Sequence, residues 1–240
     1  RMRATIGVLA VFAVLSVVPA SLSLAVPMLL KGPVKLVYFN LRGRAELPRL
    51  ILHTAGQPFD DCPYEPDLKT NYEPDLMFGQ VPLLIDGDKK IVQSRSIARY
   101  LSTKLGLCGN TEDDALLCDQ LFEGTEDIYE ALWPACAKYR GGDAAQLATI
   151  LGDGGNVHKY LAKFEKMLAG KTFLVGDALS YADLALYNVL TVTKAIEIDK
   201  YIGEHFPNIR NHHTAVETHE KVKAYVSSEA RRPAFEPWSF

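Results

Sequence analysis

Two patterns of apolar residues follow one another along this chain of 240 residues, and their order constrains the fold more than any other feature. Between Val34 and Leu105, short apolar stretches alternate with stretches of helical period, which predicts a small mixed sheet with helices on its faces. From Glu112 onward, apolar residues recur at spacings of three and four, which predicts helices alone. We therefore expect an α/β unit over residues 33–108 and an all-α unit over residues 112–240.

The first unit has the expected order β-α-β-loop-β-β-α. Its predicted elements are a strand Val34–Phe39, a helix Arg44–Ala55, an extended piece Phe59–Tyr64, a polar loop Glu65–Phe78, strands Pro82–Ile85 and Lys90–Val92, and a helix Ser94–Leu105. The turn Asp86-Gly87-Asp88 between the last two strands is typical of a hairpin.

Helices account for the expected structure of the second unit. They are predicted over Glu112–Tyr139, Val157–Leu168, Ala182–Ile196 and roughly His212–Ser227. Ser180 and Asp183 stand at the start of the third of these, where a serine followed three residues later by an aspartate predicts a variant of the capping box.

The first 32 residues differ from the rest. Arg1 and Arg3 precede an uncharged span, Ala4–Leu30, whose most apolar part, Ile6–Val18, has the length of the hydrophobic region of a signal peptide. A membrane anchor is the alternative, because the whole span is long enough to cross a bilayer. We expect a processed targeting segment and exclude it from the fold.

Composition narrows the possible partners. A formal net charge of −3 gives no electrostatic reason to expect nucleic acid. Four widely spaced cysteines, without a CxxC pair or a Cys/His ligand spacing, predict free thiols and no metal site. They are Cys62, Cys108, Cys118 and Cys136.

One segment joins the first strand to the first helix through a glycine-containing loop. It reads Tyr38-Phe39-Asn40-Leu41-Arg42-Gly43-Arg44-Ala45-Glu46. This arrangement places a phenol, two guanidinium groups and a helix N-terminus around one small space, which suits a small anion such as a thiolate.

Two further segments suggest the walls of a peptide site. In Phe78-Gly79-Gln80-Val81-Pro82, a cis bond before Pro82 would leave the main chain of Val81 free to pair with a bound peptide. In Gln93-Ser94, the serine starts a helix, where it can hold a carboxylate or act as a simple N-cap.

Residues 33–240 resemble the cytosolic-type glutathione transferases, most of all the sigma class, which includes glutathione-dependent prostaglandin D synthases and S-crystallins. The resemblance rests on the segments Tyr38–Glu46 and Phe78–Pro82, on Gln93-Ser94 with Ile97-Ala98-x-Tyr100-Leu101, and on Ser180-x-x-Asp183. It implies a thioredoxin-like N-terminal domain, an all-α C-terminal domain, glutathione as co-substrate and a homodimer. It also implies a cytoplasmic location, whereas the N-terminal span indicates a secretory or organelle route.

The resemblance implies a role for individual residues. Tyr38 would donate a hydrogen bond to the glutathione sulfur, and Arg44 would add positive potential beside it. The peptide would be held by Gln80, by the main chain of Val81 before Pro82, by Gln93 and Ser94 at the γ-glutamyl carboxylate, and by Asp127 of the other subunit at the γ-glutamyl amine.

Two regions depart from the sigma-class pattern. Lys69 and Glu73 occupy the positions where that class has a tryptophan and a lysine, so we expect Lys69 to bind the glycyl carboxylate in an acidic loop. The second substrate is expected near Phe39, Tyr129 and Trp133, where the order Trp133-Pro134 reverses the order typical of the class.

Three functions remain open at this stage. The first is conjugation of glutathione to small hydrophobic electrophiles, as in detoxification. The second is isomerisation of a prostanoid-like endoperoxide, and the third is a non-catalytic, S-crystallin-like structural role.

Overall fold

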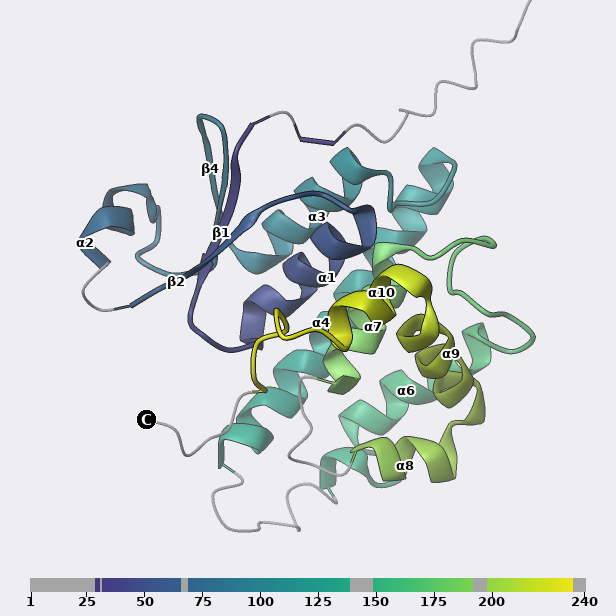
Figure 1. Cartoon of the computed structure of the whole chain (residues 1–240). Coiled ribbons are helices and arrows are strands. Elements are labelled where there is room, and N and C mark those ends of the chain that lie inside the picture. Colours follow the sequence, from purple (N-terminus) through teal and green to yellow (C-terminus); the bar gives the residue numbers. More distant parts are fainter. Residues whose placement is uncertain (1–28, 31, 66–68, 139–148, 192–197, 235–240) are drawn as a thin grey trace, which may run out of the picture.

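The computed structural model describes residues 29–30, 32–65, 69–138, 149–191 and 198–234. A four-stranded sheet with helices α1 (Glu46–Ala55) and α3 (Ser94–Leu105) forms the N-terminal part, and the later helices pack beside it (Figure 1). The predicted α/β-plus-all-α fold class is confirmed. Most of the expected targeting segment, residues 1–32, lies outside the described residues.

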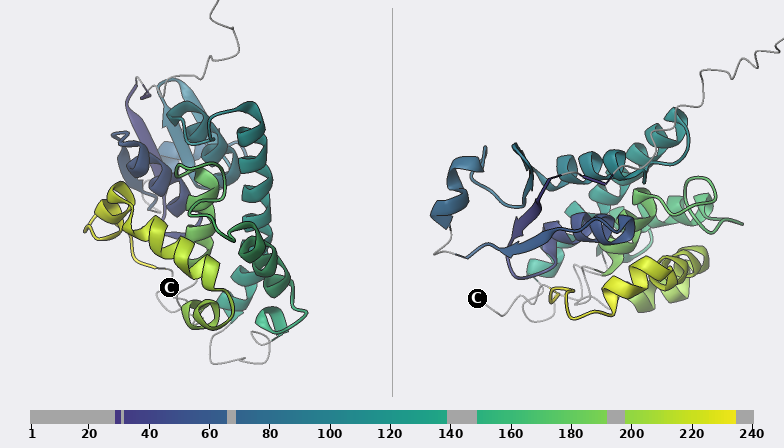
Figure 2. Two further views of the ribbon diagram at one scale, coloured as in Figure 1. Left: turned by 90° about the vertical axis from the view of Figure 1, so that its right-hand side faces the viewer. Right: turned by 45° about the horizontal axis from the view of Figure 1, so that its top comes forward.

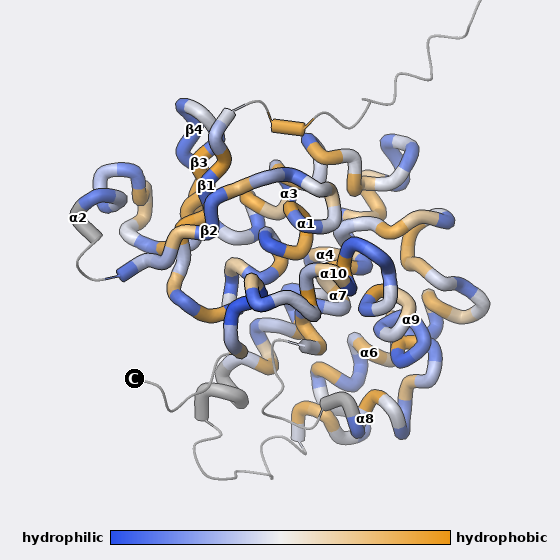
Figure 3. The backbone as a smooth tube through the Cα atoms, viewed as in Figure 1, coloured by the Kyte–Doolittle hydropathy of each residue, from blue (hydrophilic) through white to orange (hydrophobic). Residues whose placement is uncertain are grey.

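The strands of the sheet lie in the order β2-β1-β3-β4. They are β1 (Val34–Tyr38), β2 (Asp60–Pro63), β3 (Leu83–Asp86) and β4 (Lys89–Val92). β1 runs parallel to β2 and antiparallel to β3, and β3 runs antiparallel to β4. Asp86 pairs with Lys89, which confirms the predicted hairpin and leaves its turn at the hydrophilic tip seen in Figure 3.

The alternation of side chains along β1 builds a core on both faces of the sheet. Leu36 and Tyr38 point into the main hydrophobic core, which the sheet shares with the helices. Val37 points the other way, into a small cluster with Leu83 and Val92. Because both faces are covered, the strand is apolar almost throughout.

Helices α1 (Glu46–Ala55) and α3 (Ser94–Leu105) pack against each other. A short 3-10 helix, η1 (Gly43–Ala45), precedes α1, so helical structure begins one residue before the predicted start at Arg44, whereas the α-helix itself begins two residues after it. α1 also contacts α7 (Tyr181–Thr191) and α10 (Glu220–Val226) and therefore connects the sheet to the helical domain.

The segment between β2 and β3 contains helical turns that the sequence did not predict. The expected irregular loop Glu65–Phe78 holds α2 (Lys69–Tyr72) and a 3-10 helix, η3 (Glu73–Asp75). It projects from the sheet away from the helical domain (Figure 1; Figure 2, right). Lys90 ties it back to β4 through an ion pair with Asp75 at 3.1 Å.

The helical domain surrounds one fully buried helix. Its described helices are α4 (Glu112–Lys138), α6 (Asn156–Met167), α7 (Tyr181–Thr191), α8 (Ile198–His205), α9 (Pro207–Thr218) and α10 (Glu220–Val226). Every residue of α7 is buried, and α7 contacts α1, α4 and α9. The apolar run in its sequence therefore reflects burial on all sides.

Two helix predictions need correction. The expected last helix, His212–Ser227, is two helices, because the main chain at His219 is extended at φ −55° and ψ 127°. α8 was not predicted at all. The ends of two other predicted helices, Tyr139 and residues 192–196, lie outside the described residues.

The predicted capping box at α7 is confirmed on its aspartate side. Asp183 accepts hydrogen bonds from the N–H of Ser180 at 2.8 Å and from its hydroxyl at 2.6 Å. The other carboxylate oxygen accepts from the N–H of Leu174 at 2.7 Å and lies 2.9 Å from Nε2 of His212. This buried carboxylate thus joins the start of α7 to α9.

Three cysteines are described, and each is a free thiol, as predicted: Cys62, Cys108 and Cys118. Burial raises the pKa of Cys118 to about 12, so this thiol is inert at neutral pH. The side chain of Cys136 lies outside the described residues. Among the described helices, none is both long and apolar enough to cross a membrane.

Candidate active site

Tyr38 and Arg44 meet at the end of β1. The main-chain N–H of Arg44 donates a hydrogen bond to the Tyr38 hydroxyl oxygen at 3.1 Å. Gly43 makes this approach possible, because a Cβ at that position would lie 2.7 Å from the same hydroxyl and 2.7 Å from the Leu41 side chain. Gly43 also has φ +41°, a conformation that glycine adopts without steric cost.

The Tyr38 phenol is kept in its neutral form. Burial raises its pKa above the ordinary value of 10.0, and the hydrogen bond from Arg44 and the charges of Arg44 and Arg49 only partly oppose this effect. A protonated phenol can donate a hydrogen bond to an anion, whereas a phenolate cannot.

Arg44 is held between the two domains. Its guanidinium donates to Glu126 at 2.5 Å and to Glu130 at 2.5 Å, and lies 3.8 Å above the centre of the Tyr129 ring. Both acids and the tyrosine come from α4. The predicted positive charge beside Tyr38 is therefore fixed in position by the helical domain.

The loop that carries Arg42 is held by buried charges. Arg49, 1% exposed, donates to the carbonyl of Leu41 at 2.9 Å and to Asp61 of β2 at 3.0 Å. The C-terminal segment reaches the same place, since Arg232 donates to Asp61 at 2.7 Å. The loop is thus clamped from α1, from β2 and from the chain end.

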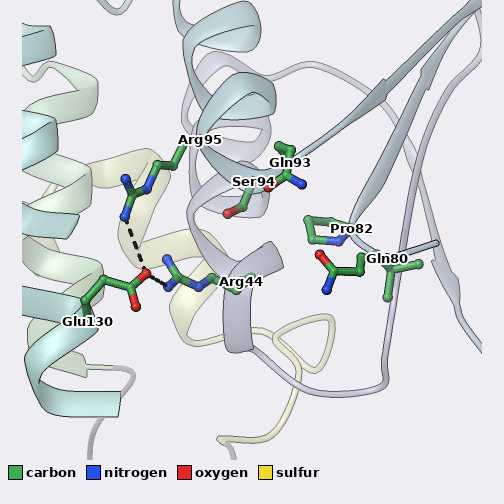
Figure 4. Close-up of a pocket in the computed structure, with 8 residues that line it drawn as sticks. Arg44, Gln80, Pro82, Gln93, Ser94, Arg95 and Glu130 are labelled. Atoms are coloured by element: carbon green, nitrogen blue, oxygen red, sulfur yellow. Dashed lines mark hydrogen bonds and ion pairs between the residues drawn. The ribbon is translucent and has the colours of Figure 1, made fainter. Parts of the chain in front are cut away.

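A cavity of about 320 Å³ lies beside Arg44. Its lining residues are Arg44, Gln80, Val81, Pro82, Gln93, Ser94, Arg95 and Glu130 (Figure 4). The pairing of β3 with β4 explains why two distant segments meet there, since Val81-Pro82 precedes β3 and Gln93-Ser94 follows β4. Tyr38 is not among the lining residues; a smaller cavity shares Arg44 and Ser94 with this one and extends to Gly43, beside the phenol.

The predicted peptide-binding segments have the expected main-chain geometry. The Val81–Pro82 bond is cis, and β3 begins after it, so Val81 lies outside the ladder of the sheet. Gln93 has φ +71°, unusual for a residue with a side chain. Such strained positions cluster at functional sites.

Ser94 does not act as a simple N-cap. Gln93 occupies the N-cap position of α3, and no side chain caps that helix end. The Ser94 side chain instead lines the cavity, as Figure 4 shows. The hydroxyl and the N-terminus of α3 are therefore both available to a carboxylate.

Arg95 and Glu130 also line the cavity, and sequence reasoning missed them. Arg95 donates to Glu126 at 2.9 Å and to Glu130 at 3.4 Å. The signal was the recurrence of acids at helical spacing on α4, at Glu123, Glu126 and Glu130, opposite arginines on α3.

Other predicted site residues lie elsewhere. Asp127 is exposed on α4, accepts a hydrogen bond from the Tyr160 hydroxyl at 2.6 Å and does not line the cavity. Lys69 begins α2, and its side chain lies outside the described part of the chain. The roles predicted for both residues stay predictions.

The three residues expected around the second substrate are only partly together. Tyr129 stacks on Trp133 with ring centres 5.7 Å apart and lies under Arg44. Phe39, 41% exposed, packs against Tyr38 and Tyr64. Among the described residues, no group of histidine, cysteine, aspartate or glutamate side chains is suited to hold a metal ion.

Comparison with known proteins identifies the family. The chain matches the models of the glutathione S-transferase N-terminal domain over residues 34–103 and of the C-terminal domain over residues 126–229. It is 34% identical to a glutathione S-transferase of Dirofilaria immitis over 205 residues, which cover 80% of this chain and 91% of that protein. The chain belongs to the glutathione S-transferase family, which uses glutathione as co-substrate, and it is an enzyme of that family.

Solved structures agree with this assignment. The glutathione S-transferase of Ascaris lumbricoides superposes with a TM-score of 0.72 at 28% identity, covering 86% of this chain and all of that one. The pi-class enzyme of Onchocerca volvulus gives 0.71 at 33% identity, covering 80% and 91%. The chain is also similar to a nu-class enzyme of Haemonchus contortus, a sigma-class enzyme of Fasciola hepatica and a monomeric enzyme of Necator americanus.

Proposed function

We propose that this protein joins the sulfur of glutathione to small hydrophobic electrophiles, and that it serves in their detoxification. The observation that carries the proposal is the neutral Tyr38 phenol, hydrogen-bonded to the N–H of Arg44 at 3.1 Å beside a peptide-sized cavity. In this scheme Tyr38 and Arg44 are the catalytic residues.

The chemical requirement is a thiolate at neutral pH. A free thiol has a pKa of about 8.5, so only a few per cent of it is ionised at pH 7. A hydrogen bond to a charged group contributes about 1.5–3 kcal/mol, which corresponds to a pKa lower by roughly one to two units. The Tyr38 hydroxyl supplies this bond, and the thiol proton passes to solvent.

The rest of the reaction needs only alignment. The thiolate attacks an electrophilic carbon, a sulfur–carbon bond forms, and a leaving group such as halide departs with its bonding electrons. Arg44, fixed by Glu126 and Glu130, keeps a positive charge beside the sulfur. In our scheme the electrophile lies against Phe39 and the stacked pair Tyr129 and Trp133.

Glutathione would be held by the cavity that adjoins Arg44. In our scheme Val81 pairs its main chain with the cysteinyl residue, and Gln93 and Ser94 hold the γ-glutamyl carboxylate. Gln80 and Pro82 complete the wall of the cavity, and Lys69 binds the glycyl carboxylate.

A homodimer of the sigma class is part of the proposal. Met77 and Phe78 are 76% and 62% exposed, next to the cavity wall at Gln80, and a second copy of the chain would cover them. The motif Tyr38–Glu46 supports the sigma class, whereas Lys69 and Glu73 depart from it. No specific observation favours the prostanoid isomerase or the S-crystallin-like role.

The test is conjugation of glutathione to a chromogenic aryl halide by the wild type and by Tyr38→Phe. We expect kcat to fall by roughly 10- to 100-fold in the variant, in line with the loss of one hydrogen bond to a charged group. Glutathione affinity, measured by calorimetry, is expected to change little. An inactive wild type that still binds glutathione would contradict the proposal.

A further inference from the structure

A buried carboxylate stands two residues after Arg44. Glu46 is the first residue of α1 and is 0% exposed. Its Oε1 atom accepts a hydrogen bond from Nε of Arg231 at 3.0 Å, and its Oε2 atom accepts one from the Tyr225 hydroxyl at 3.0 Å. Nη1 of Arg49, on the same helix, lies 3.9 Å from Oε2. A buried carboxylate is strongly destabilising unless it is paired, so its place in the core depends on these donors.

Two of the donors come from the far end of the chain. Tyr225 lies in α10, which packs against α1 (Figure 1), and its ring stacks on His53 of α1 with ring centres 4.1 Å apart. Arg231 follows α10, and its main-chain N–H donates to the carbonyl of Ser228 at 3.2 Å. Burial, and then the charge of Glu46, raise the pKa of the Tyr225 hydroxyl, which therefore stays a hydrogen-bond donor at neutral pH.

The main chain of Glu46 connects this anchor to the turn that carries Arg44. The N–H of Glu46 donates to the carbonyl of Gly43 and so closes η1, in which Arg44 lies. The N–H of Arg44 in turn donates to the Tyr38 hydroxyl at 3.1 Å. A shift of Glu46 would therefore move the donor that orients the phenol.

Helix stability alone does not explain this arrangement. The N-terminus of a helix favours an acid in its first turn, but a solvent-exposed acid provides that contribution without any loss of hydration. Glu46 is instead enclosed by donors that lie 179 and 185 residues further along the chain. The arrangement fixes the start of α1 against the C-terminal segment.

We propose that Glu46 is a positioning residue of the glutathione site, which holds the Arg44 N–H at the Tyr38 hydroxyl through its bonds to Tyr225 and Arg231. Glu46 is buried, so it acts on the sulfur only through Arg44 and Tyr38. This inference rests on the proposed function, because it assumes that the oriented phenol lowers the pKa of the glutathione thiol.

The sign of the effect distinguishes positioning from charge. Loss of a nearby negative charge alone would favour a thiolate and lower the pKa of the thiol. A displaced phenol would instead weaken the hydrogen bond to the thiolate and raise that pKa. Glu46→Gln removes the charge together with the pairing, whereas Tyr225→Phe removes one hydrogen bond and leaves the charge of Glu46 in place.

The experiment measures the pKa of the bound glutathione thiol by ultraviolet absorbance in the wild type and in both variants. We expect this pKa to rise by about one unit in Glu46→Gln and by a smaller amount in Tyr225→Phe. In Glu46→Gln, kcat/KM at a pH of about 6 should accordingly fall by up to about tenfold and recover at alkaline pH, where the thiol ionises without help.

Glu165→Gln is the matched control. Glu165 lies on α6 in the helical domain and, like Glu46, accepts two hydrogen bonds from residues distant in the sequence, the N–H groups of Asn208 and Ile209, each at 2.9 Å. The same substitution there is expected to lower the melting temperature and to leave the pKa of the bound thiol unchanged.

The outcomes separate this inference from the proposed function. A lowered thiol pKa in the wild type that stays the same or falls further in either variant would overturn the role of Glu46 alone, as would an equal rise in Glu165→Gln. A wild type whose bound thiol titrates like free glutathione would overturn both proposals. Thermal melts check folding, and should Glu46→Gln not fold, Tyr225→Phe decides: a raised pKa supports the role of Glu46, and an unchanged one contradicts it.

Discussion

The hydroxyl of Tyr38 accepts the main-chain N–H of Arg44 at 3.1 Å, across a glycine that has no room for a side chain. The residue between them, Gly43, brings a backbone donor to a buried phenol. The hydroxyl proton is left for another acceptor, which in our account is the sulfur of glutathione.

Gly43→Ala is expected to displace the phenol. The new Cβ would lie 2.7 Å from the hydroxyl of Tyr38 at φ +41°, so kcat should fall by about tenfold or more, with a loss of stability of about 1–3 kcal/mol. The matched control is Gly56→Ala, at φ +70° with nothing within 4 Å of the added Cβ. The control should lose stability but keep kcat; equal kcat in both variants would contradict the role of Gly43.

Arg232→Gln tests the clamp on the active-site loop. The Arg232 guanidinium donates hydrogen bonds to Asp61 at 2.7 Å and to Asn40 at 2.9 Å. The main-chain carbonyl of Arg232 accepts a hydrogen bond from the Arg42 side chain at 3.0 Å. Loss of the side-chain bonds should cost about 1–3 kcal/mol of stability and lower kcat several-fold, because the loop is less well positioned. Arg210→Gln, at an exposed position on α9, should change neither quantity; a similar effect of both variants would argue against the clamp.

Alkaline pH is expected to destabilise the fold through buried tyrosines. Burial raises the pKa of Tyr187 from 10.0 to about 12, although Arg231 opposes the shift. A group whose pKa is higher in the folded than in the unfolded state stabilises the fold at pH values below its unfolded-state pKa. That stabilisation is lost as the pH rises through the folded-state pKa. This residue should therefore contribute about 2–3 kcal/mol near neutral pH that disappears between pH of about 10 and 12.

Urea unfolding across this pH range measures the effect. Tyr187→Phe should flatten the decline of the free energy of unfolding with pH, because the titrating group is gone. If the free energy of unfolding of the variant falls with pH as steeply as that of the wild type, the loss of stability at alkaline pH comes from other titrating side chains.

Phe78→Ser tests the proposed homodimer. Light scattering should report a dimer for the wild type and a larger monomer fraction for the variant, because an apolar contact is lost. Met167→Ser, at a 45% exposed residue of α6, is the control and should remain dimeric. A monomeric wild type would contradict the dimer without affecting the chemistry assigned to Tyr38.

Local patterns explain which elements were predictable. β1, β3 and β4 were found because short apolar stretches and the Asp86-Gly87 turn are signals carried by neighbouring residues. The break at His219 and the helix α8 were missed, because no glycine or proline marks the break and tertiary packing determines both. Pro207 stands at the start of α9, and a proline at the first position of a helix is a start signal that the prediction did not use.

In the active site, too, the residues carried by local sequence motifs were predictable, and those placed by tertiary packing were not. The phenol, Arg44 and the Val81–Pro82 bond were predictable because short motifs carry them. The place of Glu130 in the cavity was not predictable, since it depends on how α4 lies against η1 and α3, which are far away in the sequence. That place follows from contacts with Arg44 and Arg95 that no local pattern encodes.

The pKa of the bound glutathione thiol tests the central claim most directly. Ultraviolet absorbance of the thiolate, followed against pH, measures it in the wild type and in Tyr38→Phe. We predict a value about one to two units below the free thiol in the wild type, and a return toward the free value of about 8.5 in the variant. Equal thiol pKa values in the two proteins, with glutathione bound to both, would contradict the role assigned to Tyr38.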